Sequence, residues 1–104
     1  MSQVYRPPVV NKKLQIMGAL ISAARRAKGV SQQELATRIG VSRKTAYRLE
    51  QGDPRIAWGS VMTACWLLGI PSDPEHLSDR EISELLTTGK FIGRVAPKEA
   101  RDDF

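Results

Sequence analysis

The sequence predicts an all-α fold of five short helices in one small domain. Apolar residues recur at spacings of three and four, which is the period of a helix with one buried face. Two Ser-x-x-Glu capping boxes, at Ser31 and Ser78, mark helix starts. Glycines follow the periodic segments, where helices commonly end. A chain of 104 residues and 11.5 kDa has room for one core and not for two.

The first helix is expected from Asn11 to about Ala27. We expect residues 1–11 to form an extended N-terminal arm, because Pro7 and Pro8 disfavour helix and favour extended neighbours. Gly29 is a plausible stop after the last turn. The inward positions of this helix are predicted to be Leu14, Met17, Ile21 and Ala24.

The second and third helices are expected to lie very close together in the chain. Ser31 and Glu34 form the first capping box, and this helix ends by Gly40. The next helix opens at Ser42 and ends at Gly52. Two short helices joined by a glycine-containing turn of about three residues are the signature of a helix-turn-helix motif.

The fourth helix is expected over residues 58–68, with Gly69 and Pro71 ending it. The fifth opens at the capping box of Ser78 and stops by Gly89. A short C-terminal strand over 91–95 is an open possibility. We divide the chain into the arm, a helix-turn-helix domain over 12–70, and a C-terminal helix and tail over 71–104.

The third helix carries the residues that point most clearly to a function. Since Ala46 and Leu49 are apolar and face inward, the polar and basic positions between them project outward. Arginine and lysine suit guanine edges and phosphates, and a helix fits the DNA major groove. Ser42, Thr45 and, after the helix, Arg55 suit phosphate oxygens. The outward set is Arg43, Lys44, Tyr47 and Arg48.

The charge of the chain is unevenly distributed. The net charge is +5, with ten basic and three acidic residues in 1–53 and six basic and eight acidic residues in 54–104. A basic half indicates a polyanion partner, but charge alone does not separate that from an ordinary solvated face. The motif is what favours double-stranded DNA.

Several classes of protein are excluded or disfavoured by composition. One cysteine cannot form an internal disulfide, and one cysteine with one histidine does not make a zinc site. No apolar stretch approaches the roughly 20 residues of a membrane span. The N-terminus lacks the pattern of a secretory signal, so we expect a cytoplasmic protein. We find no catalytic set and no phosphate loop, and expect no enzyme, metal or cofactor.

The segment SQQELATRIGVSRKTAYRLEQG resembles the helix-turn-helix of the XRE (Cro/C1-type) repressor class. The resemblance covers about residues 17–70 and implies a lambda-repressor-like fold that binds DNA. It implies that Gln32 contacts the DNA backbone and braces the recognition helix. It also implies that Arg25 and Glu50 form an internal pair between the first and third helices. The base-reading positions implied are Arg43, Lys44 and Arg48.

The following segment, GDPRIAWGSVMTACWLLGI, resembles HipB-type antitoxins, which pair with HipA-type serine/threonine kinase toxins. The features shared are the Gly-Asp-Pro turn, Trp58-Gly59 and Trp66, together with a tail that ends in Asp-Asp-Phe. An exposed Trp-Leu patch is typical of an interface, whereas Trp66 packed under the fifth helix is the structural alternative. The candidate partner or dimer residues are Trp66, Leu67, Phe91 and Phe104.

These observations predict a dimeric, DNA-binding transcriptional repressor. One recognition helix gives limited affinity, so a dimer on a pseudo-palindromic operator is expected. The preferred interpretation is the antitoxin of a type II toxin-antitoxin pair that represses its own operon and binds a HipA-like kinase toxin. The alternative is a stand-alone or phage-type XRE repressor. A third interpretation is an interaction adaptor that kept the fold and lost DNA binding.

Overall fold

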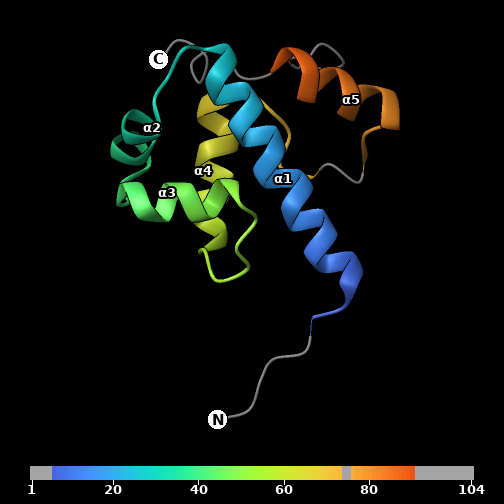
Figure 1. The fold of residues 1–104 in the computed structure, drawn as a ribbon, viewed down its shortest axis with the longest axis horizontal. Coiled ribbons are helices and arrows are strands. Elements are labelled where there is room, and N and C mark those ends of the chain that lie inside the picture. The colour runs from blue at the N-terminus through green and yellow to red at the C-terminus, as the bar shows by residue number, and fades with distance from the viewer. Residues whose placement is uncertain (1–5, 74–75, 91–104) are drawn as a thin grey trace.

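The computed structural model describes residues 6–73 and 76–90, and within them it contains five α-helices. They are α1 (Pro8–Ala27), α2 (Gln32–Ile39), α3 (Arg43–Glu50), α4 (Trp58–Leu68) and α5 (Asp79–Thr88). In Figure 1, α1 runs diagonally through the molecule, with α5 on one side and α2, α3 and α4 on the other. The all-α, five-helix fold class is therefore confirmed. The possible strand at 91–95 lies outside the described residues.

The first helix begins earlier than the sequence pattern indicates. Residues 8–10 were expected to be extended, but α1 starts at Pro8, with Pro7 as its N-cap. The expectation was wrong because proline obstructs a helix only in its interior. At the first helical position the backbone N–H has no intrahelical partner to lose, and the fixed φ of proline already suits the helix. The helical rod of α1 is therefore 20 residues long.

The boundaries of the next helices follow the local signals closely. The Ser31 hydroxyl accepts a bond from the Glu34 backbone N–H, and the Glu34 carboxylate accepts one from the Ser31 N–H. Gly40 then ends α2 in the left-handed conformation at φ 76°. The same reciprocal box starts α5 at Ser78. Each box pairs two backbone N–H groups at a helix start with side-chain oxygens of the same segment, so it needs no tertiary contact.

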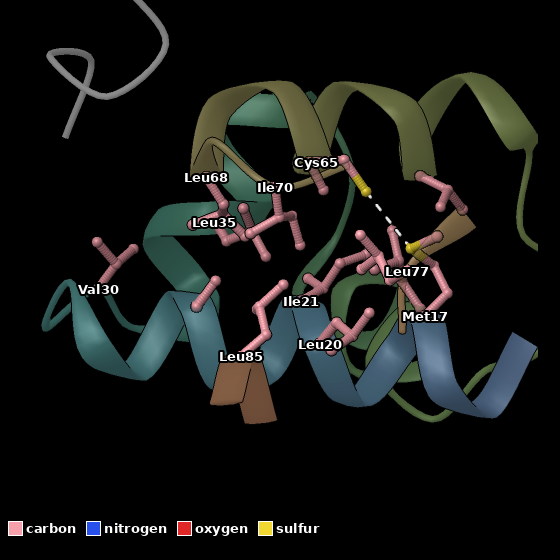
Figure 2. Packing of buried hydrophobic residues seen from close by; sticks show 14 residues of the cluster. Met17, Leu20, Ile21, Val30, Leu35, Cys65, Leu68, Ile70, Leu77 and Leu85 are labelled. Carbon is pink, nitrogen blue, oxygen red and sulfur yellow. Dashed lines mark hydrogen bonds between the residues drawn. The ribbon is translucent and has the colours of Figure 1, made fainter. Parts of the chain in front are cut away.

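The hydrophobic core lies between α1 and the helices that cross it (Figure 2). Leu20 and Ile21 of α1 are fully buried, as are Leu35 of α2 and Leu85 of α5. Leu14, predicted to face inward, is only half-buried near the start of α1. The thiol of Cys65 donates to the Met17 sulfur at 3.5 Å (Figure 2). The core thus contains side chains from all five helices.

The fifth helix packs mainly against α1, on the side away from α2 and α3 (Figure 1). Its amphipathic pattern buries Leu85 against α1 and leaves Glu84 and Leu86 exposed. None of the helices within 6–73 and 76–90 combines the length and the apolar character that a membrane span requires. Because α5 packs on the other side of α1, it leaves one side of α2 and α3 open. The candidate site lies on that open side.

Candidate nucleic-acid interface

The outward side of α3 is a continuous basic face. Arg43, Lys44, Tyr47 and Arg48 are all exposed, whereas Ala46 and Leu49 are buried. At 100° per residue these four side chains occupy one uninterrupted arc of the helix. None of the three cations forms an ion pair with a residue that the structure describes. Their charges are therefore available to an external anion.

The dimensions of α3 suit the DNA major groove. Eight residues make a helix about 12 Å long, comparable with the groove's width of about 12 Å. The helix is strongly polar on one side and apolar on the other. Its polar side could therefore enter the groove while its apolar side stays in the core. The sequence prediction that these side chains project outward is confirmed, and their contact with DNA stays a prediction.

A buried hydrogen-bond network holds α3 against α1 and α2. Arg25 of α1 donates through Nε to Glu50 Oε2 at 2.6 Å and through Nη2 to Oε1 at 3.2 Å. Its Nη1 donates to the Val30 carbonyl oxygen at 2.8 Å. Gln32 of α2 donates from Nε2 to Glu50 Oε1 at 3.1 Å. The three helices therefore share one carboxylate at the C-terminal end of α3.

This network accounts for a carboxylate on the same helix as the basic face. The Glu50 side chain is 3% exposed and that of Arg25 is 10% exposed, so both charges are buried and neither belongs to the exposed face. The buried pair implied by the resemblance is confirmed, as is the bracing role of Gln32. The contact of Gln32 with the DNA backbone stays a prediction. Residues 25 positions apart in sequence meet here, so no local pattern could have indicated the pair without the resemblance.

A close helix crossing sets the position of α3 along α1. A Cβ built on Gly18 of α1 would lie 2.5 Å from the Glu50 carbonyl oxygen. A Cβ on Gly52 would lie 2.8 Å from the backbone of Gln15, and Gly52 also has a φ of 76°. Because both obstacles are backbone atoms, a side chain at either position would push the two helices apart. The sequence analysis identified Gly52 only as the end of the third helix and did not assign it this role.

The two hydroxyl residues at the start of α3 serve the helix itself. Ser42 is the N-cap, and its Oγ accepts from the Thr45 backbone N–H at 3.1 Å. The Ser42 hydroxyl also donates to Thr45 Oγ1 at 3.0 Å. Since Ser42 is exposed and Thr45 is half-buried at the surface, both remain near any phosphate that reaches this end of α3. Their predicted phosphate contacts would add to a capping role that the structure shows directly.

Arg55 is already engaged within the chain. Its Nε and Nη2 donate to Asp53 Oδ1 and Oδ2 at 3.1 and 2.9 Å, and its backbone N–H also donates to Oδ1. These bonds lower the pKa of Asp53 to about 2 and raise the pKa of Arg55. The predicted phosphate contact must therefore share the guanidinium with Asp53, which the sequence analysis did not foresee.

The predicted partner residues separate into three groups. Trp66 is 47% exposed, so it does not pack under α5 as the structural alternative would have it. Leu67 is buried, and its assignment to an exposed Trp-Leu patch was wrong. One residue further along a helix turns the side chain by 100°, from the solvent side to the core side. Phe91 and Phe104 lie outside the described residues.

Two exposed apolar residues of α4 escaped the sequence analysis as interface candidates. Trp58 is 51% exposed and Met62 is 47% exposed, on the same side as Trp66. Their spacing of four residues was the available signal, but it resembles the spacing of a core stripe equally well. In the described part of the chain, no group of three or more His, Cys, Asp or Glu residues could hold a metal ion.

Comparison with known families agrees with this geometry. The model of a helix-turn-helix domain family matches residues 16–77, which includes most of α1, all of α2, α3 and α4, and Leu77. Neither a curated protein nor a solved structure is similar enough to this chain to count as a match. The matched range contains the whole basic face and the network that braces it.

Proposed function

Because the chain belongs to the helix-turn-helix domain family, we propose that it is a sequence-specific, DNA-binding transcriptional repressor that acts as a dimer in the cytoplasm. The observation that carries the proposal is the uninterrupted basic face of α3, whose cations have no ionic partner among the described residues. The proposal includes no catalytic activity.

In the proposed complex α3 lies in the major groove. Arg43, Lys44 and Arg48 read base edges, where arginine and lysine favour the O6 and N7 atoms of guanine. Tyr47 lies among these cations and contributes contact area. Contacts to phosphate supply most of the affinity and make it depend on salt. Gln32 reaches the backbone from the start of α2 while its amide remains bonded to Glu50.

Repression follows from occupancy of the promoter. Two recognition helices related by a two-fold axis, about 34 Å apart, would read two half-sites of a pseudo-palindrome one helical turn apart. A dimer bound there competes with the transcription machinery for the same DNA. Within each copy, the bonds to Glu50 hold α3 in a fixed position relative to α1 and α2.

The test is a fluorescence-anisotropy titration with duplex from the chain's own promoter and with a random duplex of equal length. We expect preferential binding to the promoter and a steep loss of affinity with salt. Lys44→Ala should cost about 1–3 kcal/mol and relax one base position, as should Arg48→Ala. Lys90→Ala is the matched control, since Lys90 is exposed beyond α5. Equal affinity for both duplexes at ~0.15 M salt would refute sequence-specific regulation.

A second candidate is the antitoxin function, in which the repressor also binds a HipA-like kinase toxin. It is favoured by the resemblance over 52–70 and by the exposure of Trp66, which supplies apolar surface for a partner. Co-expression with the product of the neighbouring gene tests it. A kinase-like neighbour whose product co-purifies in a stoichiometric complex would support the antitoxin. A lone gene, or a neighbour whose product does not bind, would leave the stand-alone repressor.

A further inference from the structure

The outer side of α4 is an apolar face with no cover in the described chain. Trp58, Met62 and Trp66 are 51%, 47% and 47% exposed, and they recur every four residues. At 100° per residue they fall within about 80° of one another on the helix surface. The inner side of α4 packs against α1 and α2 through Val61, Cys65 and Leu68, which leaves the stripe about half-exposed among the residues that the structure describes.

This face also carries no charge. Of the five helices that the structure describes, α4 is the one that contains no Asp, Glu, Lys or Arg. In a chain with a net charge of +5, most of the surface repels a second copy. Two copies of α4 can approach each other without bringing like charges of α4 together, and the charged residues that border the stripe are Lys13 and Asp73. The two half-exposed tryptophans on this face belong to a residue type that is enriched among the residues that dominate interface energetics.

The stripe is symmetric about its middle residue. Trp58 lies four residues before Met62, and Trp66 lies four residues after it. If two copies of α4 pack antiparallel across a two-fold axis at Met62, each Trp58 meets the Trp66 of the other copy. The same axis brings the two Met62 side chains together. A two-fold interface requires a surface that complements itself, and this spacing supplies one.

We propose that the outer face of α4 is the homodimer interface of this chain, with the two copies antiparallel about Met62. The inference rests on the proposed function in one respect, because the dimer it describes is the one expected to carry two recognition helices. The occupant is a second copy and not a charged partner, since α4 itself offers such a partner no ionic contact.

The stripe supplies only part of the area that a stable dimer buries. Two half-exposed tryptophans contribute roughly 200 Å² per copy, whereas a standard interface buries about 800 Å² per partner. The stripe therefore forms the centre, and the rest must come from its flanks. A hollow of about 410 Å³ lies beside Trp58 and one of about 310 Å³ lies beside Trp66. Both are lined by Ser72 and Asp73, so they border the stripe as parts of one surface.

The exposed side of α5 fits the same role less well. Leu86 is its large exposed apolar residue, at 42%. At 100° per residue it lies more than 100° around the helix from Arg80 and Glu84, and it stands alone, whereas α4 carries a stripe of three exposed apolar residues. Leu86 therefore offers a matched control position for a test of α4.

The test is the mass of the full chain in solution without DNA, measured by sedimentation equilibrium. The unaltered chain should have a mass of twice 11.5 kDa at micromolar concentration. Met62→Lys should raise the dimer dissociation constant by about a hundredfold or more, because it places two like charges on the axis. Leu86→Lys should leave the dimer intact. Helical circular dichroism of each variant verifies that it folds.

A mixing experiment tests the two-fold geometry itself. Met62→Lys and Met62→Glu should each be monomeric alone, and a mixture of the two should recover the dimer through a Lys–Glu pair at the axis. A dimer that survives Met62→Lys, or that Leu86→Lys abolishes, would overturn the assignment to α4. An unaltered chain that is monomeric would also overturn the assignment. The same holds if Trp66 becomes buried only when the product of the neighbouring gene binds. If such a chain still selects promoter DNA, the proposed regulator stands and only the α4 interface fails.

Discussion

The shared carboxylate of Glu50 makes a quantitative prediction about stability. Glu50→Ala removes three hydrogen bonds, two from Arg25 and one from Gln32, at distances from 2.6 to 3.2 Å. It leaves the guanidinium of Arg25, whose side chain is 10% exposed, with the Val30 carbonyl as its remaining partner. Breaking a buried ion pair in this way costs about 3–5 kcal/mol.

That cost is a large share of the total stability, which for a domain of this size is about 5–15 kcal/mol. Urea unfolding monitored by circular dichroism measures this loss of unfolding free energy. If the dependence of that free energy on urea concentration has the same slope in both proteins, the two values can be compared directly. The matched control is Arg25→Met combined with Glu50→Leu, which removes both charges and keeps the volume filled. We expect the double variant to be clearly more stable than Glu50→Ala, because no unpaired charge remains buried.

The reasoning also predicts strong coupling in a double-mutant cycle between positions 25 and 50. A loss of unfolding free energy below about 1 kcal/mol for Glu50→Ala would mean that the buried pair stabilises the fold no more than an exposed ion pair does. Additive effects of the two single substitutions would refute the network as a unit. Either result would remove the account of how α3 is held in place.

The remaining predictions concern Gly18, Asp53 and Cys65. Gly18→Ala should destabilise the fold by about 1–3 kcal/mol in urea unfolding, because its Cβ would meet a backbone oxygen at 2.5 Å. Gly59→Ala, with nothing within 4 Å of the new Cβ, should not destabilise it. Asp53→Asn should tighten DNA binding in anisotropy titrations by releasing Arg55; unchanged or weaker binding would show that Arg55 does not reach phosphate. Since the pKa of Asp53 falls to about 2 from 3.8, its stabilising contribution should be present above pH 4 and lost between pH 4 and 2, and Asp53→Asn should abolish that dependence. Cys65 should react with thiol reagents only when the protein unfolds, because burial raises the pKa of its thiol to about 12; rapid reaction of the folded chain would contradict this.

The candidate site was foreseen in part. The apolar positions Ala46 and Leu49 fixed which side of α3 is outward, so the exposure of Arg43, Lys44 and Arg48 followed from the period of one helix. The state of Arg55 did not follow from its residue type. Its guanidinium is held by Asp53, and only the conformation of the loop decides whether that bond forms.

Pattern within α4 was less informative. Its sequence is apolar on nearly every side, so periodicity did not separate a core position from an interface position. Leu67 is buried, whereas its neighbour Trp66 is 47% exposed. The side that faces inward depends on where α1 and α2 lie, and those contacts are distant in sequence.

By itself, the sequence determined where most helices begin and end. Ser31, Ser78 and the following glycines act on backbone groups within four or five residues, and such bonds form regardless of the rest of the fold. Only the tertiary structure decided which surfaces remain exposed and which charged side chains are paired inside the protein. The pair of Arg25 with Glu50 and the bare face of α4 are both set by the packing of separate helices on α1. That packing reflects long-range burial and close contact, which no window of local sequence contains.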